Sequence, residues 1–364
     1  MKPTTRRRFI RSGYFLSLAG YLIPILKFFP WSRKINDTTN KVAINVNTDT
    51  YNSSLPKSSI FEPSYLALHR SGELKKRGEE LWEMMEDCSL CPRSCGSNRL
   101  VKERGFCGAN ANLEISAYHP HHGEEKPVRG TSGSGTIFLT HCSLRCVFCI
   151  NWEVSQGGDG TRRSLNAMAN MMLDLQQMGC HNINFVTPTH YTPHILLAID
   201  IAASKGLRVP LVYNTCGWER REILKMLDGI IDIYLPDFKY SNPNMADKYS
   251  SEAFSYPDLT RKAILEMHRQ VGVAKPAEDG LMYRGLMIRH LVMPNDVSGS
   301  REVMKWIANE LPKDTYVNIM GQYRPMYKAM DYPKINRRLT YSEYDSVVQH
   351  AKAIGLTNLD IQGY

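Results

Sequence analysis

Residues 135–149 read Gly135-Thr-Ile-Phe-Leu-Thr140-His-Cys142-Ser-Leu-Arg-Cys146-Val-Phe-Cys149. The first six are mostly β-forming residues, and they predict a strand that ends where the cysteines begin. Three thiolates this close can hold three irons of a cubane cluster and leave its fourth iron without a protein ligand. The spacing therefore predicts a 4Fe–4S cluster on Cys142, Cys146 and Cys149, with one position open to a small molecule. The alternatives are a zinc site or three buried cysteines that bind nothing.

Strand and helix patterns alternate from this segment to the C-terminus. Further strands are predicted at 182–187, 209–213, 230–235, 286–293 and 315–320, and helices at 165–175, 193–204, 220–227, 260–271, 302–311 and 341–354. Six strand–helix units in succession predict an α/β fold with a parallel, barrel-like sheet wrapped by helices. Functional side chains of such a barrel gather at the carboxyl ends of its strands, which is where the first strand delivers Cys142.

The net charge of +9 is concentrated in the first 34 residues, which contain eight Lys and Arg and no acidic residue. The rest of the chain is close to neutral, so we expect no nucleic-acid partner. A hydrophobic content of 43% excludes a wholly disordered chain, and no long apolar run follows residue 32. A polytopic membrane protein is therefore excluded as well.

The N-terminal segment, residues 1–34, resembles a twin-arginine export signal. Arg6 and Arg7 precede a moderately apolar stretch that ends at Leu26. The alternative is a basic anchor on an anionic membrane surface, because the apolar stretch is shorter than the roughly 20 residues that span a bilayer. We expect export or membrane contact through this segment, with a cytoplasmic location as the alternative. Residues 35–63, rich in Asn, Thr and Ser, predict a polar linker.

A second group of cysteines lies in residues 64–130, which are predicted to form an N-terminal lobe. One or two helices from Leu66 to Met85 lead to four thiols, Cys88, Cys91, Cys95 and Cys107. Disulfides are one interpretation, because export would expose the chain to oxidants. Such short spacings nevertheless suit a single metal centre better than the pairwise geometry of disulfides. Both a structural zinc site and an auxiliary iron–sulfur cluster that relays electrons fit the spacing.

The chain from Cys88 to about Leu356 resembles the radical S-adenosylmethionine (SAM) superfamily, and within it a bacterial and archaeal group described as pyruvate formate-lyase activating enzyme-like. Besides the three-cysteine motif with Phe148, the phrases that carry this resemblance are Cys88-Ser-Leu-Cys91-Pro-Arg-Ser-Cys95, Gly133-Ser-Gly-Thr136, Asn182-Ile-Asn-Phe-Val-Thr-Pro-Thr-His-Tyr191, Tyr213-Asn-Thr-Cys-Gly217, Leu235-Pro-Asp-Phe-Lys-Tyr240 and Ile288-Arg-His290. The resemblance implies a partial (β/α)6 barrel over residues 131–364.

The resemblance also implies the cofactors and their contacts. In the family the open iron binds the amine and carboxylate of SAM, and an electron donor reduces the cluster so that SAM splits into methionine and a 5′-deoxyadenosyl radical. The implied SAM-binding residues are Phe148, Thr187, Asn214, Thr215, Asp237, Lys239 and Arg289. The Gly-Gly-Glu that usually binds the SAM amine is absent, and Thr187-Pro-Thr-His190 stands in its place.

Several of these residues have a simpler interpretation. Asp237 and Lys239 could pair with each other at a solvated strand end, and His190 could be a histidine at a helix entry. The remaining single cysteines, Cys180 and Cys216, are predicted to be small buried residues, although Cys216 lies inside the phrase that resembles a ribose-binding motif. Between the two cysteine groups stand polar residues that could line the substrate face or form a solvated loop, His121, His122, Glu124 and Glu125.

These features together predict a radical SAM oxidoreductase of the activating-enzyme type, which abstracts hydrogen with the 5′-deoxyadenosyl radical. By analogy, its target is a glycine on a partner polypeptide. The rival hypothesis is an exported, non-catalytic zinc or iron–sulfur binding protein. Twin-arginine export suits proteins that fold around a cofactor before they cross the membrane, whereas SAM and strong reductant are cytoplasmic supplies.

Overall fold

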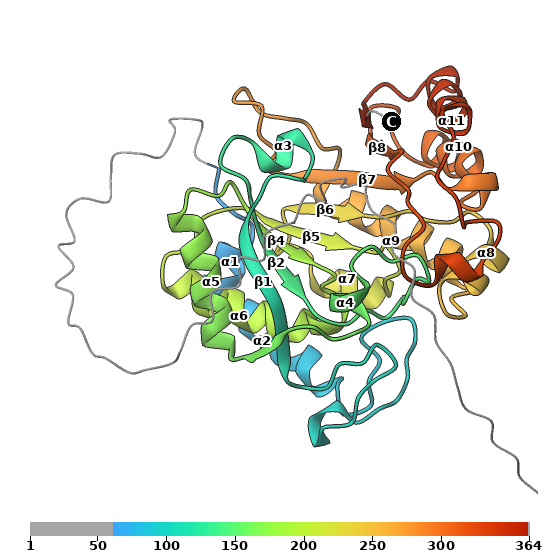
Figure 1. Ribbon diagram of the computed structural model, residues 1–364. Coiled ribbons are helices and arrows are strands. Elements are labelled where there is room, and N and C mark those ends of the chain that lie inside the picture. Colours follow the sequence, from blue (N-terminus) through green and yellow to red (C-terminus); the bar gives the residue numbers. More distant parts are fainter. Residues whose placement is uncertain (1–60, 363–364) are drawn as a thin grey trace, which may run out of the picture. The chain divides into compact units, whose positions relative to one another are not determined.

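The computed structural model describes residues 61–362, so the predicted export segment 1–34 and almost all of the predicted linker lie outside the described residues. At the centre of the described part is a nine-stranded sheet with the order β3-β1-β2-β4-β5-β6-β7-β8-β9 (Figure 1). The strands are β1 (Leu113–His121), β2 (Ser134–Leu139), β3 (Thr161–Arg163), β4 (Ile183–Val186), β5 (Leu211–Thr215), β6 (Ile233–Pro236), β7 (Gly285–Leu291), β8 (Tyr316–Met320) and β9 (Leu359–Gln362).

Seven of the described strands, β2 and β4 to β9, run parallel, and each pairs with the next along the sheet. Strand β1 pairs antiparallel with β2 and with β3 at the sheet edge. The predicted α/β fold with a parallel sheet is confirmed, with seven parallel strands where the sequence predicted six. The strand patterns did not predict β9, which has only four residues, or β1, where Pro120 and two histidines interrupt any apolar alternation.

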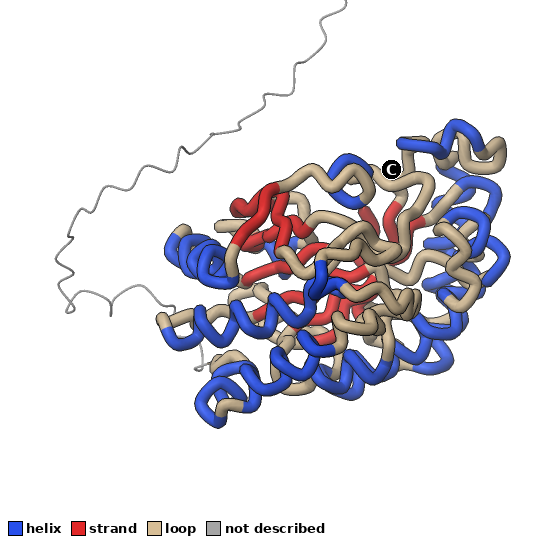
Figure 2. Tube along the Cα trace, turned by 90° about the horizontal axis from the view of Figure 1, so that it is seen from below, coloured by secondary structure: helices blue, strands red, loops and turns tan. Residues whose placement is uncertain are grey.

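The helices form an outer layer around the strands (Figures 1 and 2). They are α1 (Tyr65–Ser71), α2 (Glu73–Glu83), α3 (Lys126–Arg129), α4 (Trp152–Ser155), α5 (Leu165–Gln177), α6 (Thr192–Ser204), α7 (Arg221–Met226), α8 (Pro243–Tyr249), α9 (Tyr256–Val271), α10 (Ser300–Glu310) and α11 (Tyr341–Ala353). All six helices predicted after the cysteine motif are present, at α5, α6, α7, α9, α10 and α11. None of the helices described between residues 61 and 362 is both long enough and apolar enough to cross a membrane.

Local sequence explains where two of these helices begin. The Ser164 side chain accepts a hydrogen bond from the Ala167 N–H and so caps α5, whose buried stripe contains Met168 and Met172. Thr340 and Glu343 form a capping box at the start of α11, in which each side chain bonds to the other's backbone N–H. These caps satisfy N–H groups that a helix cannot satisfy internally.

The inner surface of the parallel sheet changes from apolar to polar toward the carboxyl ends of its strands. Side chains alternate along a strand, so residues two apart share a face. A buried apolar cluster contains Val212, Ile233, Leu235, Met287 and Tyr316. The next residues on the same faces are Asn214, Asp237, Arg289 and Asn318. The fold thus places polar side chains around the end of the barrel that also carries the cysteine loop.

The segment 64–130, predicted as a separate lobe, packs directly against barrel elements. In α2, Gly78 lies so close to α6 that an added Cβ would come within 2.8 Å of the Leu197 side chain. Strand β1 belongs to the same segment and pairs with β2 from Ile115 to His121. The segment therefore contributes the antiparallel strand β1 and the helices α1, α2 and α3 to the fold, as well as the four cysteines.

Candidate functional site

The loop after β2 carries the three motif cysteines, of which Cys142 and Cys146 are buried and Cys149 is partly exposed. His141 and Arg145 have positive φ values of 71° and 51°, which turn the chain sharply on either side of Cys142. Ser250 donates a hydrogen bond to the Cys146 sulfur at 3.1 Å, and Ser155 lies 3.2 Å from the Cys149 sulfur. The loop thus presents three thiols, and the sulfurs of Cys146 and Cys149 each meet a serine hydroxyl.

Charge around these thiols favours a thiolate at Cys142. A hydrogen bond from the Cys216 thiol, backbone N–H groups of the loop and the Lys239 ammonium lower the pKa of Cys142 to about 6. Burial instead raises the pKa of Cys146 to about 12. Burial also acts to lower the pKa of Lys239, but Asp237 and the neighbouring thiols outweigh it and raise that pKa above its usual range. The ammonium therefore stays charged beside the thiols.

The donor set fits an iron–sulfur cluster. Soft thiolates are the ligands that such clusters use, and three of them here share one loop. In the part of the chain that the structure describes, no three His, Cys, Asp or Glu side chains converge closely enough to hold a single metal ion. A cubane spreads its ligands around a cage, so convergence on one point is not what it requires. Cys142, Cys146 and Cys149 are the residues that would hold it.

The residues predicted at the ends of β5 and β6 lie next to the cysteine loop. The Lys239 ammonium is 2.6 Å from the Asp237 carboxylate, and both side chains are mostly buried. The pairing that we weighed as the simpler interpretation is thus present, although beside the buried thiols and not at a solvated strand end. Asn214 and Thr215 follow on β5, and the Asn214 side-chain oxygen accepts a hydrogen bond from Arg289 at 3.3 Å.

Arg289 is brought to the same end of the barrel but is occupied by two carboxylates that the sequence did not pair with it. It donates to both oxygens of Glu125 at 2.6 Å and forms a short ion pair with Glu124. Glu125 also accepts a hydrogen bond from Asn318 at 2.7 Å, and its side chain is fully buried. Glu124 and Glu125 therefore do not belong to a solvated loop, and that interpretation of the segment is wrong for these two residues.

The histidines of this region are separated. His121 lies at the end of β1 with its ring near those of His119 and Phe138, while His122 is exposed. His190 is buried, with its Nε2 2.8 Å from the Thr140 carbonyl oxygen. His190 therefore supports the residue that directly follows β2, Thr140.

The turn after β4 has a strained backbone, and one of its threonines bonds to a carboxylate from the loop after β5. Thr187, a β-branched residue, has a φ of 59° and donates its N–H to the Asn214 carbonyl. Thr189 donates to Glu219 at 2.6 Å, and Thr215 makes a short hydrogen bond to the same oxygen. The second Glu219 oxygen is buried without a partner, and burial raises the pKa of this carboxyl to about 7. Sequence reasoning missed Glu219, because it looks like one more surface acid among Arg220, Arg221 and Glu222.

Phe148 lies among aromatic side chains. It is buried and meets Tyr240 and Tyr323 edge-on, with ring centroids 6.4 and 6.0 Å apart. These rings form an apolar wall on one side of the cysteine loop, and such a wall limits the access of water to the thiols.

The four earlier cysteines are also neighbours. Each of the thiols Cys88, Cys95 and Cys107 adds to the burial that raises the pKa of Cys91 to about 12. The buried Arg99 guanidinium lies 3.8 Å from the Cys88 sulfur, and the Cys107 sulfur accepts the Ala109 N–H. This group thus combines four thiols with one buried cation.

Arg93 joins the two cysteine groups. Its guanidinium donates to the Ser143 carbonyl in the motif loop and to the Ser250 carbonyl, both at 3.1 Å. It also stacks on the Phe106 ring at 4.0 Å, next to Cys107. One side chain therefore spans from the first group to the loop of the second, a connection that the sequence did not reveal.

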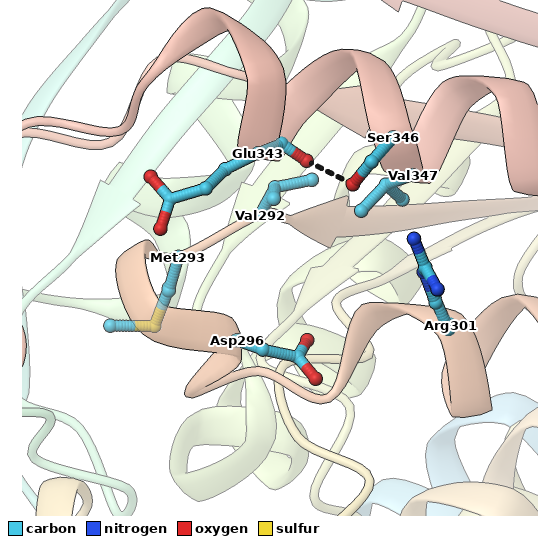
Figure 3. A pocket seen from close by; sticks show the side chains of 7 residues that line it. All are labelled: Val292, Met293, Asp296, Arg301, Glu343, Ser346 and Val347. Carbon is cyan, nitrogen blue, oxygen red and sulfur yellow. Dashed lines mark hydrogen bonds between the residues drawn. The ribbon is translucent and has the colours of Figure 1, made fainter.

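A pocket of about 230 Å³ lies elsewhere, between α10 and α11 beyond the end of β7 (Figure 3). Its lining includes Asp296, Arg301 and Glu343, and none of the predicted site residues. Glu343 is already held by Arg337 at 2.7 Å. The cysteines and the pocket are thus separate features.

Comparisons with known proteins agree with the site. The family model described as the radical SAM superfamily matches residues 136–272, which run from β2 to the end of α9. An uncharacterized protein of Methanocaldococcus jannaschii, MJ0674, is 31% identical over 280 residues, which cover 75% of this chain and 76% of that protein. The chain belongs to the radical SAM superfamily. A second uncharacterized protein of that organism, MJ0808, is 22% identical and covers 69% of this chain and 76% of its own.

Solved structures with some likeness include a radical SAM methyltransferase from Sphaerobacter thermophilus, with 12% identity and a TM-score of 0.44. That match covers 63% of this chain and 66% of the methyltransferase, slightly less than two thirds. A methylornithine synthase matches with 13% identity and a TM-score of 0.39, over 60% of this chain and 68% of its own. Membership of the radical SAM superfamily implies an enzyme with a 4Fe–4S cluster and SAM as cofactors, so the sequence prediction is confirmed at that level.

Proposed function

We propose that this radical SAM protein cleaves SAM reductively at a cluster held by Cys142, Cys146 and Cys149, and uses the product for hydrogen abstraction. The observation that carries the proposal is the set of three thiols, two of them buried, on one loop at the carboxyl end of β2, beside the charged Lys239. When bound, the cluster and SAM supply a 5′-deoxyadenosyl radical that removes a hydrogen atom from the substrate.

The chain's own residues prepare this site. Lys239 balances the negative charge of the thiolates, and Asp237 fixes its ammonium at 2.6 Å. Phe148 and its aromatic neighbours exclude water, which protects a reactive radical. We propose Asn214, Thr215 and Thr187 as SAM contacts, because all three lie at the ends of β4 and β5 next to the cysteine loop. For Arg289 the same role requires it to keep its ion pairs with Glu124 and Glu125 while it reaches SAM.

The test is the release of 5′-deoxyadenosine. The protein is reconstituted anaerobically with iron and sulfide, reduced, and given SAM, alongside Cys146→Ala and the control Cys180→Ala. Cys180 is a single buried cysteine that lies near the start of β2, so its loss leaves the motif intact. We expect release from the wild type and the control only. Equal release from Cys146→Ala and the wild type would remove the enzyme hypothesis, and zinc without iron in the purified protein would favour the non-catalytic rival.

We further propose that the substrate is a glycine residue of a partner polypeptide. The support is two exposed apolar side chains, one on the cysteine loop and one on a segment that is hydrogen-bonded to this loop. Ile150, directly after Cys149, is 62% exposed, and Met330 is 60% exposed. The segment with Met330 is tied to the motif loop by the Lys328 N–H, which donates to the Val147 carbonyl. Exposed apolar side chains near the cysteine loop suit contact with a macromolecular partner. The reduced enzyme is given SAM and a protein extract from cells grown on α-deuterated glycine. Deuterium from this extract should appear in 5′-deoxyadenosine, and protease treatment of the extract should abolish the transfer. Transfer that survives protease treatment would contradict a polypeptide substrate.

For Cys88, Cys91, Cys95 and Cys107 we propose an auxiliary iron–sulfur cluster that relays electrons, with structural zinc as the alternative. The support is the Arg93 bridge, which connects this group to the motif loop at two carbonyls. The reconstituted protein should then contain about eight irons per chain, and a Cys88→Ala, Cys91→Ala variant about four. Four irons and one zinc in the wild type would identify the zinc site.

We propose export or membrane association through residues 1–34, as their sequence suggests. Fractionation of cells that make the full-length chain tests this. Recovery in the soluble cytoplasm with Arg6 and Arg7 intact would refute it.

A further inference from the structure

Polar side chains from four strands line the inner face of the barrel. On β4, Asn184 pairs with Val212 of β5, so it lies on the inner face that Asn214 also shares. Farther along the sheet, Arg289 of β7 pairs with Asn318 of β8. The inner face therefore presents amides from three strands and one guanidinium.

Two carboxylates from the segment before α3 bind these side chains. Asn184 donates from Nδ2 to Glu124 at 3.0 Å, and Asn318 donates from Nδ2 to Glu125 at 2.7 Å. Arg289 forms ion pairs with both carboxylates. These hydrogen bonds join five side chains into one group, which we call the barrel cluster: Glu124, Glu125, Asn184, Arg289 and Asn318.

Two amide oxygens of the barrel cluster accept no hydrogen bond from any described residue. They are the Oδ1 atoms of Asn184 and Asn318, and both are buried. Because a carboxylate only accepts hydrogen bonds, each amide must present its NH2 group to its glutamate, and the atom without a partner is therefore the oxygen. A buried acceptor without a donor is unfavourable. The two oxygens thus require N–H or O–H groups that the described chain does not supply.

The barrel cluster also has one more negative charge than it balances. In the described part of the chain, Arg289 is the only cation that forms an ion pair with Glu124 or Glu125. One guanidinium neutralises one of the two carboxylates, and a buried charge without a counter-charge is costly. Glu125 is fully buried, whereas the side chains of Glu124 and Arg289 are 7% and 14% exposed. The accessible side of the cluster is therefore the side that carries Glu124 and Arg289.

We propose that the barrel cluster binds a positively charged N–H group of the substrate, the ammonium of a lysine or the guanidinium of an arginine near the reactive glycine. This inference rests on the proposed function, because it names the group that the substrate presents to the barrel. Such a group supplies the charge that balances the second carboxylate and the N–H donors that both amide oxygens lack.

The position of the cluster suits a substrate. Arg289 donates to Asn214 at 3.3 Å, and Asn214 is one of the residues proposed to contact SAM. A group held by the cluster therefore lies beside the proposed SAM site. SAM is itself a cation, but in the family the open iron takes its amine. The cluster thus serves a second cation.

The experiment measures the binding of small probes to the reconstituted protein in the presence of SAM. The probes are Nα-acetyl-lysine amide, Nα-acetyl-arginine amide and the uncharged analogue Nα-acetyl-norleucine amide. We expect at least one cation to bind about 10-fold more tightly than the norleucine analogue. The bound cation should also slow deuterium transfer from the labelled extract while the Kd for SAM stays unchanged.

Three variants assign this preference to the cluster. Glu124→Gln removes the unbalanced charge while Arg289 keeps its two hydrogen bonds to Glu125, so we expect the preference for a cation to disappear and the fold to remain. Glu124→Asp keeps the charge and should keep most of the preference. The matched control Glu153→Gln removes an exposed acid of α4 that has no ion-pair partner in the described residues, and it should bind the probes as the wild type does.

The wild type alone can overturn the proposal, even if a variant fails to fold. A norleucine analogue that binds as tightly as both cations would do so, as would the absence of saturation by either cation below about 50 mM. Water alone would then satisfy the amide oxygens. A preference that survives in Glu124→Gln would refute the role of the cluster. Competition between the cations and SAM would assign the cluster to SAM, and undiminished deuterium transfer would place the cation outside the substrate site.

The outcomes also separate this proposal from the proposed function, because probe binding requires no turnover. Cation binding at the cluster without release of 5′-deoxyadenosine would refute the proposed enzyme and leave a cation site. Release of 5′-deoxyadenosine without any preference for a cation would refute the cation site and leave the enzyme.

Discussion

Replacement of Glu125 by glutamine removes one charge from a buried ion pair and leaves the size of the side chain unchanged. Glu125 accepts two hydrogen bonds from Arg289 at 2.6 Å and one from Asn318 at 2.7 Å. A glutamine has only one acceptor oxygen. Its NH2 group, which is a donor, would face a guanidinium N–H of Arg289, which is also a donor. Loss of one partner of a buried pair costs about 3–5 kcal/mol. Because Glu124 still pairs with Arg289, we expect the lower limit, about 3 kcal/mol.

This loss is large enough to measure as a change in Tm. The entropy of unfolding is about 2.1 cal/mol/K per residue, or about 0.6 kcal/mol/K for the roughly 300 residues described here, so 3 kcal/mol corresponds to about 5 °C. Burial acts to raise the pKa of Glu125, but Arg289 outweighs it, and the net pKa lies below its ordinary value of 4.5. The carboxylate therefore stabilises the fold fully above pH 4.5 and loses this effect as the pH falls through its lowered pKa. The difference in Tm between wild type and variant should shrink in the same range.

Glu62→Gln is the matched control. Glu62 meets Arg70 at 2.7 Å, with the same chemistry, but both side chains are more than half exposed. Exposed pairs contribute little because water and salt screen them, so we expect no measurable change in Tm. The measurement is calorimetry of both variants at pH 7 and at lower pH. A Glu125→Gln shift no larger than that of the control would refute the assignment of a stabilising buried ion pair at this end of the barrel.

Three further changes test other parts of the site. Burial raises the pKa of Glu219 from 4.5 to about 7, so its contribution to stability is greatest below pH 4.5 and is lost as the pH rises through about 7. Glu219→Gln should remove a pH-dependent loss of about 3 kcal/mol between those limits, measured as Tm against pH. Arg93→Lys keeps the charge but not the forked geometry that bridges two carbonyls, and should lower the free energy of unfolding by about 2 kcal/mol in urea titration. Gly217→Ala should lower it by more than about 2 kcal/mol, since the added Cβ strikes a backbone oxygen. Gly206→Ala, where φ is also positive but nothing lies within 4 Å, should lower it by only about 1 kcal/mol.

The sequence predicted the parts of the fold that repeat a local pattern. The apolar stripe of α5 and the strands β2 and β4 to β8 follow from residues that are neighbours along the chain. Strand β1 could not be predicted in this way, because it has no alternating pattern of its own. It is a strand because β2 and β3 pair with it on either side. Strand β9 similarly depends on β8, whose paired residues lie 42 positions earlier in the chain.

The same distinction holds for the site. Cys142, Cys146 and Cys149 were predictable because their spacing is itself the signal for a shared centre. The partners of Arg289 were not, because Glu124 and Glu125 lie 165 and 164 positions away. The motif suggested that Arg289 contacts SAM, but in the folded chain its charge is already paired with Glu124 and Glu125.

Glu219 illustrates the opposite case, in which a residue type is missing from a motif but present in space. The turn after β4 has threonines where the resembling family has an acid, so the sequence suggested that no carboxylate stands there. In the fold, Glu219 lies in the loop after β5 and accepts a hydrogen bond from Thr189. Thr215 donates a hydrogen bond to the same Glu219 oxygen. A carboxylate is thus present at the end of β4, with one buried oxygen free of any partner. Because parallel strands bring their carboxyl ends to one edge, a side chain four residues past β5 can reach the position that a motif assigns to β4. The chemistry of this barrel must therefore be compared by position in the fold, and not by alignment of its motifs alone.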